Sequence, residues 1–289
     1  MKKLDQITVA GLGLLGGSIA LAASRSFPGT KVVGYTHRAG TRRKAVELAV
    51  ATDVVGDIKE SVSKADIVIL AMPICTFEEY FGQIAASLPR GCIVTDVGST
   101  KILPQRWAAR RLPGTVHYVG SHPIAGSEQR GVEFARDDLF EGAMCILTTT
   151  AKTNRSALQT LKEFWAALGC SVKVMKPAEH DRIFANVSHL PHIVAAALIN
   201  ANKSEELKFA GKGFMDTSRV ASGPVNVWAD ILLTNTGNIA GGIDRTISEL
   251  SKLKKAVRRG DKEQVESLLK RARDKRSKLI SYKMKRKEL

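Results

Sequence analysis

The chain has 289 residues, enough for two domains, and its hydrophobic content of 44% is typical of a globular protein with a sizeable core. Lys and Arg outnumber Asp and Glu by 44 to 28, which favours anionic partners. Much of this excess lies in the last helical stretch and in the run Lys283-Met-Lys-Arg-Lys287, with no interleaved aromatic side chains, so we expect no nucleic-acid partner. The four cysteines are widely spaced and indicate reduced thiols rather than a disulfide framework or a zinc site.

The N-terminus superficially resembles a signal peptide, because Lys2 and Lys3 precede an apolar stretch. Asp5 interrupts that pattern, and four glycines break the apolar run. A signal peptide does not need those glycines, whereas a phosphate-binding turn does. No other stretch is judged long and apolar enough to span a membrane, so we expect a cytoplasmic protein without a membrane partner.

The first half alternates short apolar runs with amphipathic segments, which predicts a doubly wound, Rossmann-type α/β fold with a parallel sheet covered by helices. The predicted helices are 18–25, 42–49, 76–88, 102–111 and 154–168. The predicted strands are Gln6–Ala10, Lys31–Tyr35, Asp66–Ala71, Cys92–Asp96, His117–Val119, Met144–Thr148 and a last edge strand at Ser171–Met175.

After Pro177 the pattern becomes entirely helical, with one long helix over 178–202 that Pro191 should kink. We therefore predict a sheet domain at 1–176 and an all-helical substrate and dimerisation domain at 177–289, which makes a homodimer the expected assembly. Gly260 should end one late helix, and Asp261 with Gln264 should begin the next. Apolar residues at steps of three and four predict one buried stripe: Ile239, Ile243, Ile247, Leu250, Leu253 and Val257.

A glycine-rich turn, Gly11-Leu12-Gly13-Leu14-Leu15-Gly16, lies directly between the first predicted strand and the first helix. In this position Gly11 permits a tight turn, Gly13 lets the backbone approach a pyrophosphate, and Gly16 allows close packing of helix on strand. The helix N-terminus then offers N–H donors to the phosphates. The turn predicts a nicotinamide dinucleotide cofactor.

The end of the second strand bears on the choice between NADP and NAD. Enzymes that use NAD usually place an acid there for the ribose hydroxyls. This chain has Thr36, followed by His37 and Arg38, with Arg42 and Arg43 close behind. Because a hydroxyl and guanidinium groups suit a 2′-phosphate, NADP is favoured, with NAD as the alternative.

Four further polar segments follow: Asp96-Val-Gly-Ser-Thr-Lys101, Gly120-Ser-His-Pro-Ile-Ala-Gly-Ser-Glu128, Ser188-His-Leu-Pro-His192 and Asp216-Thr-Ser-Arg219. The first two follow the predicted strands Cys92–Asp96 and His117–Val119, and the third lies in the long predicted helix. The fourth lies in a polar loop of the helical part. Together with the glycine turn, their order and spacing resemble the prephenate/arogenate dehydrogenase family over nearly the whole chain. The resemblance implies hydride transfer from a ring acid to NAD(P), with loss of CO2, on the route to tyrosine.

The resemblance assigns His122 as the catalytic base that accepts the proton of the substrate hydroxyl. It assigns Ser99 to contact both that hydroxyl and the nicotinamide. Arg219 matches the arginine that holds a substrate carboxylate, a role for which a planar fork is suited. His192 is expected to line the substrate pocket, and Glu128 matches a position near the substrate side chain.

Some alternatives remain open from the sequence. Arogenate is an alternative substrate to prephenate, and Glu128 does not decide between them. The H-x-x-H spacing of His189 and His192 suggests metal, but we expect none because no third ligand is near. More distant alternatives are a β-hydroxyacid or imine reductase and a non-catalytic nicotinamide-binding protein.

Overall fold

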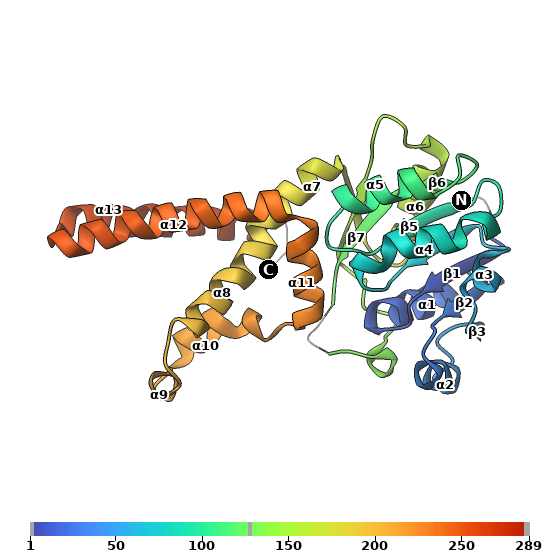
Figure 1. Ribbon diagram of the computed structural model, residues 1–289, viewed down its shortest axis with the longest axis horizontal. Helices are drawn as coiled ribbons and strands as arrows, with labels where there is room; N and C mark the ends of the chain where they lie inside the picture. The colour runs from blue at the N-terminus through green and yellow to red at the C-terminus, as the bar shows by residue number, and fades with distance from the viewer. Residues whose placement is uncertain (1–2, 127–128, 286–289) are drawn as a thin grey trace. The chain divides into compact units, whose positions relative to one another are not determined.

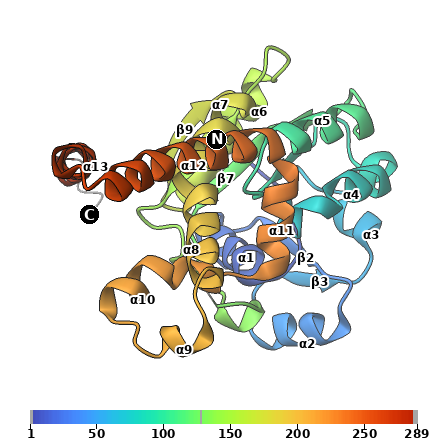
Figure 2. The same cartoon turned by 60° about the vertical axis from the view of Figure 1, so that its left-hand side comes forward.

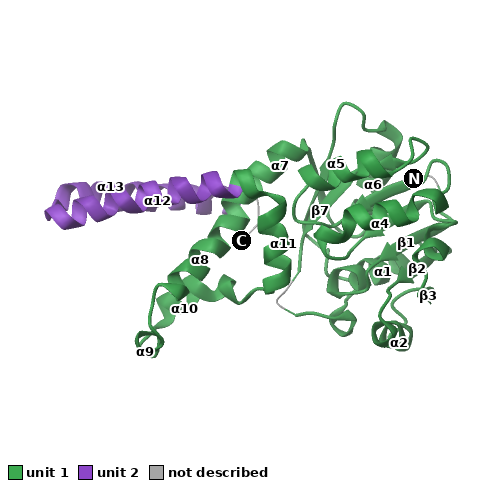
Figure 3. Ribbon diagram, in the orientation of Figure 1, with its two compact units in different colours: residues 1–238 green, residues 239–289 purple. Residues whose placement is uncertain are grey.

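The computed structural model describes residues 3–126 and 129–285 (Figure 1). The chain forms two compact units, residues 1–238 and 239–289, which Figure 3 shows in different colours. Unit 1 contains both the sheets and most of the helices, so all predicted site residues within the described ranges belong to it.

The main sheet of unit 1 has six parallel strands in the order β3-β2-β1-β4-β5-β6. The chain starts in the middle of this sheet, and the strand order reverses between β1 and β4, as in a doubly wound fold. This confirms the predicted fold class. The bounds are β1 Gln6–Ala10, β2 Lys31–Tyr35, β3 Asp53–Val55, β4 Ile67–Leu70, β5 Ile93–Asp96 and β6 His117–Tyr118.

Alternate side chains of the strands feed two cores, one on each face of the sheet. On β4, Ile67 and Ile69 join the core that contains Ile19 of α1, while Val68 and Leu70 join the other core. Helices therefore cover both faces, and the central strands are buried throughout. The helices are α1 Leu14–Ser26, α2 Ala39–Glu47, α3 Ile58–Val62, α4 Phe77–Ile84, α5 Ile102–Arg111 and α6 Arg155–Ala167.

A second sheet corrects the sequence prediction, which placed all strands in one sheet and missed β3 and β7. Strand β7 (Gly120–Ile124) pairs antiparallel with β8 (Met144–Thr148), and β8 pairs parallel with β9 (Ser171–Met175). The two sheets approach each other at β5 and β7, where the hydroxyls of Thr95 and Ser121 lie 2.6 Å apart. β7 therefore begins beside the carboxyl end of the main sheet.

The helical part of unit 1 differs from the single kinked helix predicted over 178–202. Helix α7 (Pro177–Phe184) widens into a π-helical turn, η4 (Ala185–His189), before α8 (Leu190–Asn200). The irregularity precedes Pro191 because proline lacks an N–H and its ring crowds the carbonyl four residues earlier. The remaining elements are α9 Ser204–Leu207, α10 Lys212–Ser218, η5 Arg219–Ser222 and α11 Val225–Thr234, and Figure 2 shows α8 and α11 in front of α1.

The stretch Pro177–Asn200 is long and apolar enough, by length and composition, to cross a membrane, which corrects the expectation that no such stretch exists. Part of it is nevertheless packed inside the protein: Ala185, His189 and Ala195 are buried. Core helices share this composition.

Unit 2 is a helical hairpin that includes most of α12 (Thr236–Arg259) and all of α13 (Lys262–Lys285). As predicted, Gly260 follows the end of α12 with a φ of +64°, and the Asp261 carboxylate accepts the N–H of Gln264 at 2.9 Å. The predicted burial of the stripe on α12 is wrong for most of its length. Ile247, Leu250 and Val257 are 55%, 62% and 62% exposed, because the hairpin alone provides too little surface to cover them.

Candidate functional site

In the glycine turn after β1, the backbone lies close to the ends of β2 and β4. Gly11 has a φ of +102°, its N–H donates to the Tyr35 carbonyl at 2.8 Å, and a Cβ there would lie 2.5 Å from the Ala71 carbonyl oxygen. A Cβ on Gly16 would overlap the Gly11 carbonyl oxygen. Gly11 and Gly16 are therefore required by the fold of the turn itself.

Gly13 is different, since a Cβ at this position would meet no atom of the described residues within 4 Å. It is the N-cap residue of α1, and as a glycine it has no side chain to cap that helix end. The open space and the uncapped N-terminus together fit an anionic group such as a pyrophosphate. Leu12 is buried against Gly34, whereas Leu14 and Leu15 are half-buried at the start of α1.

The loop after β2 separates residues that the sequence could not distinguish. Thr36 is buried, and its hydroxyl lies 3.4 Å from the Arg38 N–H that donates to it. The Arg42 guanidinium donates to the carbonyls of Thr36 and His37 at 3.1 and 3.0 Å, so it stabilises the loop. His37 and Arg38 are exposed and remain accessible to a ligand.

A chain of hydrogen bonds leads from His122 on β7 into the helical part. His122 Nδ1 lies 2.8 Å from His180 Nε2, and His180 Nδ1 lies 2.8 Å from Asp181 Oδ1. The Asp181 carboxylate also accepts the backbone N–H groups of Lys101 and Ile102, at 2.7 and 2.9 Å. It thus caps the start of α5 while it holds the imidazole pair.

The surroundings of His122 keep its imidazole neutral. Burial is the main cause that lowers its pKa well below the ordinary value, and His180 and the positive charge of Lys101 lower this pKa further. The fully buried Lys101 ammonium contacts Asp96, which also accepts the Tyr118 hydroxyl at 2.6 Å. A partly buried, neutral imidazole is a suitable proton acceptor at neutral pH.

Ser99 lies in the loop after β5, where it is half-buried. The Asp96 carboxylate accepts the Gly98 N–H at 2.7 Å and shapes this loop. The next residue, Thr100, donates its hydroxyl to that of Thr234 on α11 at 2.9 Å. Ser99 is thereby held where the carboxyl end of the sheet meets the helical part.

His192 and Arg219 lie together on adjoining elements of the helical part. His192 stacks on Trp228, with ring centroids 3.7 Å apart and an interplanar angle of 10°. Among the described residues, none forms a hydrogen bond with the buried Nδ1 of His192. Burial lowers the pKa of His192, and a hydrogen bond with the backbone of Val220 opposes this shift in part. Arg219 is exposed at the start of η5, which packs on α8, the helix of His192. The predicted residue Glu128 lies outside the described residues.

The sequence reasoning missed His180, Asp181 and Trp228. Adjacent histidine and aspartate directly after the predicted domain boundary were a signal, but the region was interpreted only as a helix. His189 is buried, with Nδ1 3.4 Å from Asn235 Nδ2, and burial lowers its pKa to about 4. Within residues 3–126 and 129–285, no three His, Cys, Asp or Glu side chains are placed to hold a metal ion.

A doubly wound sheet with a glycine turn at its switch point, and a partly buried imidazole on the strand β7 that lies next to β5, define a nucleotide-dependent oxidoreductase. Two family models match the chain: "Prephenate dehydrogenase, nucleotide-binding domain" over residues 19–174 and "Prephenate dehydrogenase, dimerization domain" over residues 176–271. The chain belongs to the prephenate dehydrogenase family, whose members are NAD(P)-dependent oxidoreductases.

Individual relatives agree with this assignment. The prephenate dehydrogenase of Bacillus subtilis is 37% identical over 93% of this chain and 75% of its own length. A crystal structure of the Aquifex aeolicus prephenate dehydrogenase with hydroxyphenyl propionate and NAD+ is 34% identical, with a TM-score of 0.88 over 95% of this chain and 98% of that one. Arogenate dehydrogenase of Synechocystis is 29% identical, with a TM-score of 0.81 over 95% and 99%.

Proposed function

We propose that this protein catalyses the oxidative decarboxylation of prephenate to 4-hydroxyphenylpyruvate, with hydride transfer to NAD(P)+. The observation that carries the proposal is the hydrogen bond of His122 to His180 beside the carboxyl end of the nucleotide-binding sheet, where burial lowers the pKa of His122. The reaction needs a base that takes one proton from a ring hydroxyl while the hydride leaves the same carbon.

His122 accepts the hydroxyl proton as the carbon–oxygen bond becomes a carbonyl. Bound nicotinamide supplies the acceptor for the hydride. The carbon–carbon bond to the ring carboxylate then breaks, CO2 leaves, and the bonding electrons make the ring aromatic as a phenolate. His122 returns its proton to that oxygen, so the reaction releases no net proton and leaves the base ready for another turnover.

The remaining predicted residues bind and orient the reactants in this proposal. Ser99 hydrogen-bonds the substrate hydroxyl at the nicotinamide. Arg219 holds a substrate carboxylate through its guanidinium, His192 lines the same pocket on its Trp228 support, and Glu128 lies near the substrate side chain. The exposed position of Arg219 and its closeness to His192 through η5 support this grouping.

For the cofactor, we propose the Gly11–Gly16 turn as the pyrophosphate site and NADP as the preferred dinucleotide. No carboxylate follows β2, since Thr36 stands there, and the exposed Arg38 can pair with a 2′-phosphate. Arg42 has a different task, because its guanidinium already binds backbone carbonyls of the loop. NAD is the alternative.

Arogenate is the second candidate substrate, favoured by the structural similarity to an arogenate dehydrogenase. The two substrates differ in one group, a keto oxygen in prephenate and an ammonium in arogenate. A β-hydroxyacid or imine reductase would not need His122, and a non-catalytic nicotinamide-binding protein would need neither His122 nor Arg219.

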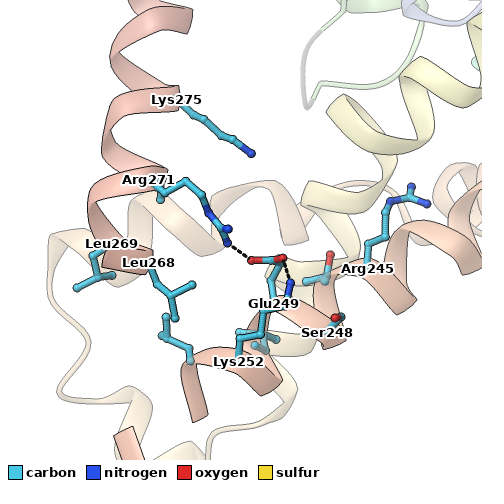
Figure 4. A pocket seen from close by; sticks show the side chains of 12 residues that line it. Arg245, Ser248, Glu249, Lys252, Leu268, Leu269, Arg271 and Lys275 are labelled. Atoms are coloured by element: carbon cyan, nitrogen blue, oxygen red, sulfur yellow. Dashed lines mark hydrogen bonds and ion pairs between the residues drawn. The ribbon is translucent and has the colours of Figure 1, made fainter. Parts of the chain in front are cut away.

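We propose a homodimer that buries the exposed apolar surface of unit 2. A groove of about 690 Å³ lies between α12 and α13, and its lining includes Leu250, Leu268 and Leu269 (Figure 4). Leu250 and Leu269 are 62% and 56% exposed, whereas Leu268 is buried. Two long helices with so little buried surface need a partner to be stable, and the match to a dimerization domain supports a second copy of this chain.

We propose a domain boundary near residue 176 and a cytoplasmic location. The boundary is supported by the two family matches, which meet at 174 and 176. The location is supported by Pro177–Asn200, because this apolar stretch contributes His180 and His192 to the site and is partly buried in the protein.

Product analysis tests the proposed reaction. Purified protein is incubated with prephenate or arogenate and with NADP+ or NAD+, and the organic product and CO2 are quantified against reduced nicotinamide. We expect one 4-hydroxyphenylpyruvate and one CO2 for each NADPH formed from prephenate. Tyrosine formation from arogenate alone would transfer the assignment to arogenate, and reduced nicotinamide without CO2 would exclude both reactions.

A further inference from the structure

The hydrogen bonds behind His122 fix which nitrogen of each imidazole carries its proton. The Asp181 carboxylate is an acceptor toward three donors: Oδ1 receives the Lys101 N–H and faces His180, and Oδ2 receives the Ile102 N–H. An acceptor in this position requires a proton on His180 Nδ1. Both His180 and Asp181 are fully buried, so solvent does not compete for these bonds.

The tautomer of His180 then determines that of His122. With its proton on Nδ1, a neutral His180 presents a bare Nε2 to His122 Nδ1, 2.8 Å away. Two bare nitrogens would repel each other at that distance, so His122 carries its proton on Nδ1 and has a free lone pair on Nε2. Burial lowers the pKa of His180, which supports its neutral form.

We infer that His180 and Asp181 are positioning residues that hold His122 in the one neutral tautomer whose Nε2 can accept a proton. The opposite arrangement, with a donor at His180 Nε2, would place a proton on His122 Nε2 and remove its capacity as a base. The Phe184 ring packs on both imidazoles, with centroid distances of 4.9 Å to His122 and 4.5 Å to His180, and restricts their rotation. The same chain stabilises the His122 cation once it has accepted the proton, because the negative charge of Asp181 lies at its far end.

The first test is kinetic and rests on the proposed function. In Asp181→Asn, either amide orientation harms His122: the NH2 group facing His180 reverses both tautomers, and the oxygen facing His180 leaves the chain without its negative charge. We expect kcat to fall by about 100-fold or more while the prephenate KM changes by less than about threefold. Asp261→Asn is the matched control, because the Asp261 carboxylate also caps a helix, accepting the Gln264 N–H at the start of α13 in unit 2, and we expect it to leave kcat unchanged.

A double-mutant cycle separates positioning from a merely structural role. Asp181 also caps α5, so D181N should lower the thermal stability in any background. If Asp181 acts through His122, D181N should have no further effect on kcat in a His122→Asn background. Equal fold losses of kcat in the wild-type and H122N backgrounds would overturn the inference.

The second test needs no substrate and is therefore independent of the proposed reaction. Two-bond ¹H–¹⁵N correlations in protein labelled with ¹⁵N-histidine distinguish the two neutral tautomers, and H122N and His180→Gln assign the signals. We expect protonated Nδ1 on both His122 and His180 in the resting wild type. A proton on His122 Nε2 would overturn the inference, whereas the expected tautomers in a protein that does not oxidise prephenate would overturn only the proposed function.

Discussion

The glycine turn allows a test in which the ligand and the fold respond to different substitutions. Gly13→Ala places a methyl group where no atom of residues 3–126 or 129–285 lies within 4 Å, at a φ of −92° and a ψ of −160° that alanine adopts readily. The alanine restricts the unfolded chain, which stabilises by about 0.4–1 kcal/mol, and it is a poorer N-cap by a similar amount. The free energy of unfolding should therefore change little.

The bound nucleotide should respond strongly to the same methyl group. If the open space over Gly13 receives the pyrophosphate, the methyl group displaces it from the N–H groups of α1. A loss of about 1.4 kcal/mol corresponds to a tenfold rise in Kd, and we expect at least that for NADP+ and NAD+ in calorimetric titration. Wild-type Kd values for G13A, in a protein with unchanged Tm, would refute the placement of the phosphates.

Gly16→Ala is the matched control, because its methyl group would overlap the Gly11 carbonyl oxygen and lie 3.1 Å from the Ala71 Cβ. Relief of that overlap requires a backbone shift, which costs about 1–3 kcal/mol. We expect a lower Tm together with weaker nucleotide binding. A substitution that disturbs binding through the fold is thereby separated from one that disturbs the ligand directly.

Further predictions concern the catalytic base, the residue that holds the substrate carboxylate, the cofactor, the stability at acidic pH and the dimer. H122N should lower kcat by about 10²- to 10⁴-fold with nucleotide affinity retained, and an unchanged rate would exclude the base assignment. Arg219→Ala should raise the prephenate KM by about tenfold or more with a smaller change in kcat, and a normal KM would place the carboxylate clamp elsewhere. Arg38→Ala should weaken NADP+ more than NAD+, and equal losses would make it a general contact. Burial lowers the pKa of His189 from 6.5 to about 4, so between these pH values the unfolded chain binds a proton that the folded protein does not. The free energy of unfolding should therefore be unaffected by His189 above pH 6.5 and should fall below it, by up to about 1.4 kcal/mol per pH unit. A chemical denaturation series that shows constant stability from neutral pH to about pH 4 would contradict this. Leu250→Glu should convert the dimer to monomer in analytical ultracentrifugation, and a stable L250E dimer would place the interface elsewhere.

Much of the fold could be predicted because its signals are local. Strand β1 and the turn after it combine a buried apolar run with glycines at fixed spacing, and both were placed correctly. The second sheet could not be predicted in this way. Whether β8 joins the main sheet or pairs with β7 depends on contacts between residues such as His122 and Ile146, which are far apart in the sequence. Strand β3 was missed since its three residues are too few for a periodic pattern.

The residues of the candidate site also differ in whether a local sequence signal or only the folded chain reveals them. His122, Ser99 and Arg219 stand in segments whose order and spacing resemble the prephenate/arogenate dehydrogenase family, and that resemblance selected them. His180 and Asp181 form hydrogen bonds with His122 on β7 and with the backbone at the start of α5, and only the folded chain brings these groups within hydrogen-bond distance. The exposed stripe on α12 shows the converse case, because its periodicity correctly indicates a helix but does not say whether this chain or a second copy covers it.

Initial rates of nicotinamide reduction test the central claim most directly. Wild-type protein and H122N are mixed with prephenate and saturating NADP+ or NAD+, and the absorbance of the reduced cofactor is followed. The proposed chemistry predicts rapid reduction by the wild type and a loss of at least about 100-fold in the variant. A wild-type protein that binds either dinucleotide but reduces none of it with prephenate would contradict the assignment.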